Sequence, residues 1–275
     1  MPTSAAAPRT RRDRHDQHHR HESFAGRPDV MLLRSVLVYR RAWWEILSGL
    51  FEPLFYLVIL GNGMGALLKE DSGPLGAGYA AFIAPGLLAA SAMNGAVYDT
   101  TMGIFFKLRH ARLYEALMAT PLGLLDIALG EILWAALRGA AYGTVFIGVM
   151  AALGLVSSPW AIAVPAAAFV VALGFAALGL AATTCMRTWQ DTQFVRLVTV
   201  PLLMFSTTFY PLSVYPGPVQ AIVRATPLYQ AIELMRGLVD GHAGPSLLGH
   251  LGYFAAVLAL GLLVATRRLN RLLIH

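Results

Sequence analysis

The chain has 275 residues, of which 57% are hydrophobic and only 13% carry a charge. Soluble domains carry about 25% charged residues, so this composition excludes an ordinary soluble domain. The apolar residues gather in runs of about 20, the length that a helix needs to cross about 30 Å of hydrocarbon. Within these runs they do not alternate with polar residues, which excludes a membrane β-barrel. We therefore predict an all-α polytopic membrane protein.

Six segments have the length and polarity of transmembrane helices, and they belong to one predicted transmembrane domain over residues 30–275. In chain order the predicted spans are Ile46–Leu68, Tyr79–Tyr98, Ile127–Leu153, Trp160–Thr183, Phe194–Tyr210 and Leu247–Thr266. Residues 1–29 are basic, rich in histidine and without apolar periodicity, so we expect a disordered cytoplasmic tail. Residues 30–45 have one apolar helical face, which predicts an interfacial helix on the cytoplasmic leaflet.

Lysine and arginine residues predict the orientation of the chain, because cytoplasmic flanks retain them. Nine arginines precede the first span, and three lysines or arginines fall between the second and third spans. Two more flank the loop after the fourth span and three close the chain, so seventeen lie on one side and only three in the opposite loops. Both termini are therefore expected in the cytoplasm. The net charge of +6 is explained by this asymmetry and needs no nucleic-acid partner.

Motifs for nucleotide hydrolysis or other enzymatic chemistry do not occur in the sequence. A P-loop needs Gly-Lys-Ser/Thr, but the two lysines, Lys69 and Lys107, follow Leu68 and Phe106. No nucleophile elbow and no zinc-protease motif is found either. The single cysteine, Cys185, gives no disulfide framework and no thiolate metal site. We therefore predict no catalytic residue, no metal site and no cofactor in this chain, which is not expected to be an enzyme.

The segment between the second and third predicted spans combines a basic amphipathic helix with a turn. It reads KLRHARLYEALMATPLGLLDIALGEILWAALRG from Lys107 to Gly139. At 100° per residue, apolar side chains group on one side of the helix and charged side chains on the other. Pro121 then ends the helix and turns the chain into the third span. These residues leave two interpretations open, a helix that docks on a partner and an ordinary interfacial helix.

Four charged residues lie within or near the predicted spans: Glu52, Asp99, Glu131 and Arg138. A charge in hydrocarbon is costly, so such residues are usually paired or face water. Glu131 and Arg138 are seven residues apart, about 10.5 Å along a helix axis, which is too far for direct pairing. Each is therefore expected to meet a partner on another helix. Structural pairing and contact with a transported molecule both fit, and Glu131 is also near enough to the cytoplasmic end to be hydrated.

The stretch before the last predicted span contains four prolines and is too polar and too broken to cross a membrane. Two short helices are predicted there, Val219–Val223 and Leu228–Val239, with a break between them. Such a pair suggests a re-entrant hairpin that dips into the outer leaflet. Glu233 and Arg236 are i, i+3 neighbours and can pair on the second helix. An ordinary external loop is the alternative.

These segments resemble the ABC-2 family, the membrane subunits of ABC exporters, and within it the daunorubicin-resistance and nodulation lipo-oligosaccharide exporter branch. The likeness rests on the run ALMATPLGLLDIALGEIL and on Pro227-Leu228 followed by Arg236 nine residues after the proline. In that family the first segment bears on the ATPase subunit. The ATPase-coupling residues that the resemblance implies are Lys107, Arg109, Arg112, Tyr114, Glu115, Met118 and Pro121. The hairpin gate would comprise Pro227, Gln230, Glu233 and Arg236.

The resemblance implies a permease subunit of an ATP-driven exporter in the bacterial plasma membrane. Two permease subunits, identical or paralogous, would form a path for a drug, lipid or glycolipid. Two copies of a separate cytosolic ATPase would bind ATP and Mg²⁺ and act through a loop helix over residues 107–121. An ion- or proton-coupled secondary transporter with Glu52, Asp99 or Glu131 as carrier is the alternative, although no inverted repeat is evident. A non-transporting scaffold would leave the loop helix and the intramembrane charges unexplained.

Overall fold

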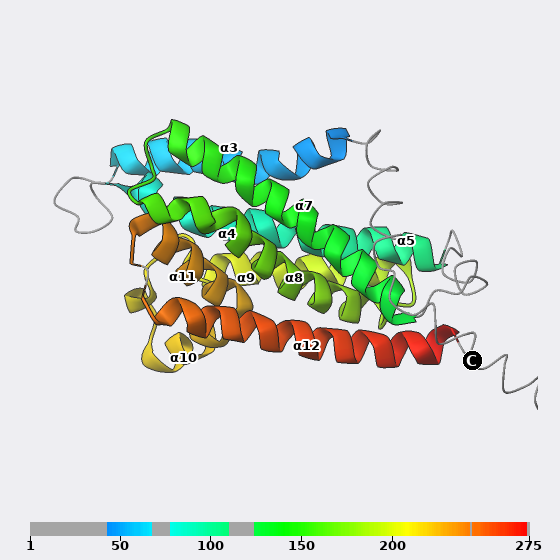
Figure 1. Ribbon diagram of the computed structural model, residues 1–275. Helices are drawn as coiled ribbons and strands as arrows, with labels where there is room; N and C mark the ends of the chain where they lie inside the picture. The colour runs from blue at the N-terminus through cyan, green and yellow to red at the C-terminus, as the bar shows by residue number, and fades with distance from the viewer. Residues whose placement is uncertain (1–42, 68–77, 110–123, 243, 274–275) are drawn as a thin grey trace, which may run out of the picture.

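The computed structural model describes residues 43–67, 78–109, 124–242 and 244–273, which form helices and short connections (Figure 1). The long helices run side by side and are α3 (Trp43–Leu67), α4 (Tyr79–Tyr98), α7 (Leu124–Ala152), α8 (Val164–Thr183) and α12 (Ser246–Leu273). A shorter helix, α9 (Thr192–Phe205), lies among them. No strand occurs in these described ranges, and the all-α prediction is confirmed for them.

Four helices of the described residues are long and apolar enough to cross a membrane. They are Tyr79–Lys107, Leu125–Ala152, Pro159–Thr183 and Ser246–Arg271. These four coincide with the second, third, fourth and sixth predicted spans. The first predicted span falls on α3, in which Phe51–Gly61 is a shorter apolar stretch. The chain is thus an integral membrane protein with several apolar helices.

The fifth predicted span, Phe194–Tyr210, is longer than the helix found there. α9 has 14 residues, which extend about 21 Å and fall short of about 30 Å of hydrocarbon. Beyond it Thr207 has φ 66°, a left-handed conformation with which an α-helix cannot continue. The chain then turns into η5 (Leu212–Val214) instead of reaching Tyr210 as a helix.

Small residues bring the central helices into close contact. A Cβ atom at Gly139 of α7 would lie 2.6 Å from Ala172 Cβ on α8 and 2.7 Å from the Ala92 carbonyl oxygen on α4. A Cβ atom at Gly261 of α12 would lie 2.7 Å from Ala177 Cβ on α8. Glycine at both positions permits the backbone approach on which membrane helices depend, since lipid provides no hydrophobic driving force between them. α8 therefore packs against α4, α7 and α12 at the centre of the bundle.

The two ends of the bundle carry different short elements (Figure 1). At one end lie α10 (Gly217–Ala225) and α11 (Pro227–Asp240), and α11 packs against α4. At the other end lie α5 (Ile104–Arg109) and the last turns of α12. A π-helical turn, η2 (Asp99–Gly103), joins α4 to α5. The two remaining elements are η3 (Pro159–Ala163) before α8 and η4 (Trp189–Asp191) before α9.

Candidate functional site

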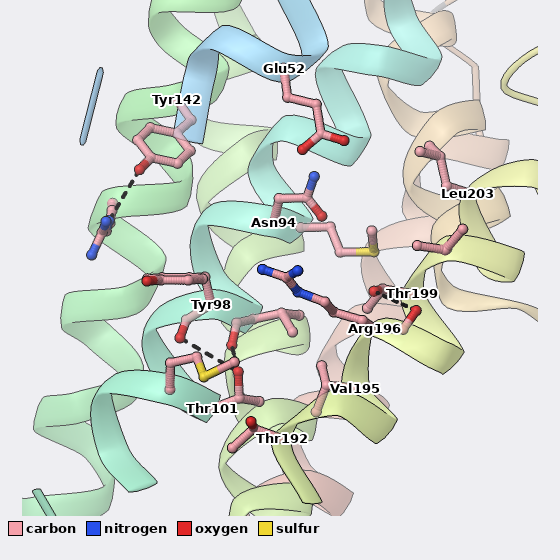
Figure 2. Close-up of a pocket in the computed structure, with 15 residues that line it drawn as sticks. Glu52, Asn94, Tyr98, Thr101, Tyr142, Thr192, Val195, Arg196, Thr199 and Leu203 are labelled. Atoms are coloured by element: carbon pink, nitrogen blue, oxygen red, sulfur yellow. Dashed lines mark hydrogen bonds between the residues drawn. The ribbon is translucent and has the colours of Figure 1, made fainter. Parts of the chain in front are cut away.

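A cavity of about 450 Å³ lies between α3, α4, α7 and α9 (Figure 2). Most helices around it are apolar, yet polar side chains from all four line its wall. They include Glu52, Asn94, Thr101, Arg138, Arg196 and Thr199. Concave sites with an apolar frame and a few convergent polar groups are where proteins usually bind small molecules. This cavity is therefore the candidate functional site.

Arg138 is held on one wall of the cavity by a buried ion pair with Asp99. The Arg138 Nη1 and Asp99 Oδ1 atoms are 3.4 Å apart, and each side chain is only 3% exposed. Arg138 Nε also donates to the hydroxyl oxygen of Tyr142 at 3.3 Å. The guanidinium carbon lies 5.9 Å from the ring centroids of both Tyr98 and Tyr142, within the range of a cation–π contact. The charge of Arg138 is thus balanced by the Asp99 carboxylate, with the two tyrosines packed around the guanidinium.

Asp99 is placed by the π-helical turn η2 at the end of α4. Inside this turn Thr100 Oγ1 donates to the Ala96 carbonyl at 2.8 Å, and Thr101 Oγ1 donates to Val97 at 2.6 Å. Thr183 of α8 donates to the Thr100 carbonyl at 2.7 Å, which ties the turn to the neighbouring helix. π-Helical turns within α-helices are rare and occur frequently at functional sites. The turn directs Asp99 toward α7, where Arg138 lies.

Glu131 of α7 pairs with Lys107 of α5, in a second ion pair between α7 and the segment that contains Asp99. The Lys107 Nζ and Glu131 Oε2 atoms are 2.6 Å apart, and the two side chains are 17% and 2% exposed. The expected partners on other helices are thereby confirmed for both Glu131 and Arg138. The interpretation of Glu131 as a simply hydrated residue was wrong, because its carboxylate is buried against Lys107.

The two ion pairs join the same two helical segments, and the segment that supplies the acid in one pair supplies the base in the other. The α4–η2–α5 segment contributes the acid Asp99 and then the base Lys107, while α7 contributes the acid Glu131 and then the base Arg138. Because the segments run antiparallel, each acid meets a base. A slip that brought Asp99 to Glu131 would place like charges together in a low-dielectric interior, which is unfavourable. The ion pairs therefore favour a single register between these two segments.

Arg196 enters the cavity from α9 on the side opposite α7. Figure 2 shows its guanidinium directed into the cavity toward Asn94, with Glu52 on the far side of that amide. Among the described residues no ion pair joins Arg196 to an acid. By its place in the sequence Arg196 counts only as a cytoplasmic flank charge. Its position inside the predicted interval 194–210 was the signal that could have identified it.

A second cavity, of about 610 Å³, lies on the other side of α9 and is mainly apolar. Its wall includes Phe175 and Leu178 of α8 and Phe194, Val198 and Leu202 of α9. The two cavities are adjacent, because both are lined by Met93, Val97, Thr101, Val195 and Thr199. The second extends from Cys185 and Asp191 at one end of α9 to Pro227 at the other.

The predicted pair of short helices is confirmed as α10 and α11, with Thr226 between them. On α11, Arg236 Nη1 lies 2.7 Å from Glu233 Oε1, and the two side chains are 21% and 31% exposed. The Arg236 guanidinium lies 4.8 Å from the ring centroid of Phe82 on α4. Its Nη2 atom donates to the carbonyl of Thr207 at 3.4 Å. Arg236 thus connects α11 to α4 and to the turn after α9.

Gln230 connects the same hairpin to α12. Its Oε1 atom lies 2.5 Å from Nδ1 of His250, and its Nε2 atom donates to the Arg224 carbonyl at 2.6 Å. Tyr253 of α12 donates to the carbonyl of Ala225 at 2.8 Å. Two carbonyls that end α10 are therefore satisfied by side chains from neighbouring elements.

Comparison with known proteins decides the family. Residues 29–239 match the family described as ABC-2 type transporter. The chain belongs to this family. It is 33% identical over 251 residues to nodulation protein J of Neorhizobium galegae, an alignment that covers 87% of this chain and 94% of that protein. It is also 33% identical over 255 residues to nodulation protein J of Rhizobium leguminosarum bv. trifolii, with 88% and 95% covered.

A further relative of this ABC-2 permease carries a different name. The chain is 27% identical over 220 residues to the probable doxorubicin resistance ABC transporter permease protein DrrC of Mycobacterium tuberculosis. That alignment covers 76% of this chain and 74% of the relative. The predicted family resemblance is confirmed, and the chain is a membrane subunit of an ABC transporter.

The predicted site residues of this ABC-2 permease do not all lie together. Glu52 and Arg138 line the 450 Å³ cavity, and Asp99 pairs with Arg138, whereas Glu131 lies with Lys107 outside the cavity lining. Arg109 ends α5. Four other groups of predictions fall outside the described residues. They concern the N-terminal tail, most of the interfacial helix, the end of the first span and the loop helix. The loop-helix residues concerned are Arg112, Tyr114, Glu115, Met118 and Pro121.

Proposed function

We propose that this ABC-2 permease is one half of a transmembrane dimer in an exporter of the bacterial plasma membrane. Two permease subunits, identical or paralogous, form the translocation path for a drug, lipid or glycolipid. Two copies of a separate cytosolic ATPase, which binds ATP and Mg²⁺, bind the permease subunits on the cytoplasmic side of the membrane. The chain crosses the membrane six times with both termini in the cytoplasm, and the fifth crossing is made by the short helix α9 together with the residues that follow it. Residues 1–29 form a cytoplasmic tail outside the transmembrane domain.

The observation that carries the coupling proposal is the ion pair between Lys107 and Glu131. Lys107 begins the segment over residues 107–121, and its ammonium group lies 2.6 Å from the buried Glu131 carboxylate on α7. A displacement of this segment by the ATPase therefore pulls on α7 as well as on α5. Because α7 also holds Arg138, the displacement reaches the wall of the 450 Å³ cavity. This contact supports a coupling role for Lys107. The family implies the same role for the rest of the segment, namely Arg109, Arg112, Tyr114, Glu115, Met118 and Pro121.

The α10–α11 hairpin is proposed as the gate at the outer end of the path. Its break at Thr226–Pro227 cannot face lipid, because each unsatisfied backbone group there would cost several kcal/mol. Contacts of Gln230 with α12 and of Arg236 with α4 hold the hairpin against the bundle. Pro227 also lines the far end of the apolar cavity beside α9. A rotation of the hairpin would therefore open or close that end.

The test of this function is reconstitution with the ATPase subunit of the same transporter. The permease alone should show no ATP hydrolysis, and the complex should couple hydrolysis to export. The substitutions Arg112→Ala, Tyr114→Ala and Glu115→Ala should weaken ATPase binding or separate hydrolysis from transport while the permease stays folded. Arg268→Ala, an exposed cation near the end of α12, serves as the matched control and should leave both unchanged.

Two outcomes would contradict the proposal. Unchanged ATPase stimulation and export in all three loop variants would mean that the loop helix is merely interfacial. Transport by the permease alone, driven by a proton gradient and abolished by Asp99→Asn, would instead establish a secondary transporter.

A further inference from the structure

Arg196 is the cation of the 450 Å³ cavity whose charge the described residues leave unmatched. Arg138, on the opposite wall, is neutralised by Asp99 at 3.4 Å. Arg196 forms no such pair with a described acid, although its side chain points into the cavity beside Asn94 (Figure 2). Arg196 is exposed where it lines the cavity, so its guanidinium is accessible to a ligand that enters there. A negative group at the α9 wall would balance its charge.

The groups near Arg196 suit an oxyanion. A guanidinium presents planar N–H donors that match the oxygens of phosphate, sulfate or carboxylate. The amide of Asn94 and the hydroxyl of Thr199 line the same cavity and can donate further hydrogen bonds. Glu52 lies beyond Asn94, as seen from Arg196 (Figure 2), so its repulsion keeps an anion at the α9 wall.

The apolar cavity on the other side of α9 supplies room for a hydrocarbon tail. Val97, Thr101 and Thr199 line both cavities, so the polar and apolar cavities adjoin at these three side chains. Phe175, Leu178 and other large apolar residues line the apolar cavity. Volumes of about 450 and about 610 Å³ fall within the range of about 300–1,000 Å³ that small-molecule sites have. The polar and apolar halves together have the chemistry of an amphiphile.

We propose that the two cavities beside α9 bind one anionic amphiphile, with its oxyanion on Arg196 and Asn94 and its hydrocarbon tail against Phe175, Leu178 and Phe194. This inference rests on the proposed function, since the bound amphiphile stands in for the transported molecule. The inference narrows the substrate class from any drug, lipid or glycolipid to an amphiphile with a negatively charged head group. Arg196 is then the residue that selects the sign of the head charge.

The test compares three probes on the purified full-length permease in a neutral detergent. Dodecyl phosphate has the proposed head and tail, dodecyltrimethylammonium has the same tail with the opposite charge, and inorganic phosphate has no tail. Dodecyl phosphate should bind about tenfold more tightly than either of the others, since the cationic probe lacks the charge-assisted hydrogen bond and inorganic phosphate lacks the apolar tail. Affinity is measured by thermal stabilisation and by native mass spectrometry.

Variants assign the preference to the site. Arg196→Gln should reduce the affinity for dodecyl phosphate about tenfold and abolish the preference over the cationic probe. Asn94→Asp, which adds a negative charge beside Arg196, should do the same. Arg267→Gln removes an exposed arginine of α12 outside both cavities and should change neither.

Each remaining outcome overturns part or all of the inference. Full anion preference in Arg196→Gln excludes Arg196 as the binding group. Tighter binding of the ammonium probe excludes a negative head and points to Glu52, and equal binding of inorganic phosphate excludes the amphiphile. Because these measurements use the permease without its ATPase, they separate this inference from the proposed function. A permease that couples to its ATPase but shows no anion preference would contradict only the site.

Discussion

Arg138 and Asp99 are each 3% exposed, so water cannot solvate either charge once the partner is removed. Removing one member of such a pair costs about 3–5 kcal/mol, whereas removing both costs much less. We expect Asp99→Asn and Arg138→Gln each to lower the melting temperature of the purified permease. The double variant should recover most of that loss, which a double-mutant cycle on thermal unfolding measures. Strictly additive losses would contradict a coupled pair.

A matched variant separates the charge of Asp99 from the remaining contacts of Arg138. Tyr142→Phe removes only the hydroxyl that accepts from Arg138 Nε and keeps the ring that packs beside the guanidinium. Its expected cost is about 1 kcal/mol, the contribution of one hydrogen bond, and well below that of Asp99→Asn. A loss as large as that of Asp99→Asn would mean that the tyrosine, and not the carboxylate, holds the arginine.

Asp191 gives the turn between α8 and α9 a dependence on pH. Hydrogen bonds from the backbone N–H groups of Thr188 and Arg187 to its carboxylate lower the pKa of Asp191 below the ordinary value of 3.8. An acid whose pKa is lowered by folding stabilises the folded state above its unfolded pKa, and that stability is lost as the pH falls through the folded pKa. Wild type should therefore melt higher than Asp191→Asn at pH 7, by a margin that shrinks below about pH 4.

The control for this pH dependence is the exposed neighbour Gln190. Gln190→Ala leaves the carboxylate in place, so its melting temperature should follow that of wild type across the same pH range. If the margin between wild type and Asp191→Asn stays constant with pH, the effect of Asp191 is one of helix propensity rather than of its charge.

At the level of single residues, sequence reasoning identified the intramembrane charges but not their partners. The cost of a charge in hydrocarbon predicts that Glu131 and Arg138 are paired, because that cost depends only on the apolar surroundings. The identity of the partner depends on how helices pack, which spacing along one helix does not contain. Arg196 was missed for a related reason. Counting cations by loop assigned it to a flank, whereas the helix that carries it begins at Thr192.

Among the elements, long apolar runs were predicted well and broken ones only in part. The predicted Tyr79–Tyr98 and the helix α4 have the same bounds, since Gly78 and the π-helical turn mark its ends. For the fifth span, hydropathy could not detect the positive φ of Thr207 that ends the helical run. The π-helical turn itself has no periodic signal, because an apolar sequence on both sides conceals one added residue.

The hairpin α10–α11 gives a prediction about transport rather than stability. Glu233 and Arg236 are 31% and 21% exposed, so solvent screening keeps their direct contribution to the free energy of unfolding small. Arg236 nevertheless also contacts Phe82 and Thr207. The substitution Glu233→Ala would leave the positive charge of Arg236 at these contacts without its paired carboxylate. We expect Glu233→Ala or Arg236→Ala to reduce export more than the double variant does. ATPase binding should survive in all three.

The measurement for the hairpin is a double-mutant cycle on export by the reconstituted complex. The control is Arg224→Ala, which removes an exposed arginine of α10 and should change export little. Small and strictly additive effects of the two substitutions would show an ordinary solvated loop, and the gate proposal would then be withdrawn.

For the whole molecule, the large apolar side chains left exposed by one subunit indicate what surrounds it. Phe51 and Phe55 of α3 and Phe194 and Leu197 of α9 are between 50% and 67% exposed. In the apolar window of α12 only 11% is buried. Such faces are compatible with lipid or with a second permease subunit, and not with water. The proposed dimer and the surrounding bilayer are both consistent with these faces. Export across the bilayer also requires that every permease chain has the same orientation in the membrane.

Cys185 makes that orientation measurable, because it is the only cysteine of the chain and is exposed beyond the end of α8. The asymmetry of seventeen to three lysines and arginines puts this end of α8 in the cytoplasm. In intact cells, wild type should react with a membrane-permeant maleimide but not with an impermeant one. In a Cys185→Ala background, Ser157→Cys in the loop before α8 should react with both reagents, since the 20 residues of α8 separate the two sites by about 30 Å. Both sites should react after the cells are permeabilised, which controls for accessibility. Impermeant labelling of Cys185 in intact cells would reverse the topology and would leave residues 107–121 on the wrong side to meet a cytosolic ATPase.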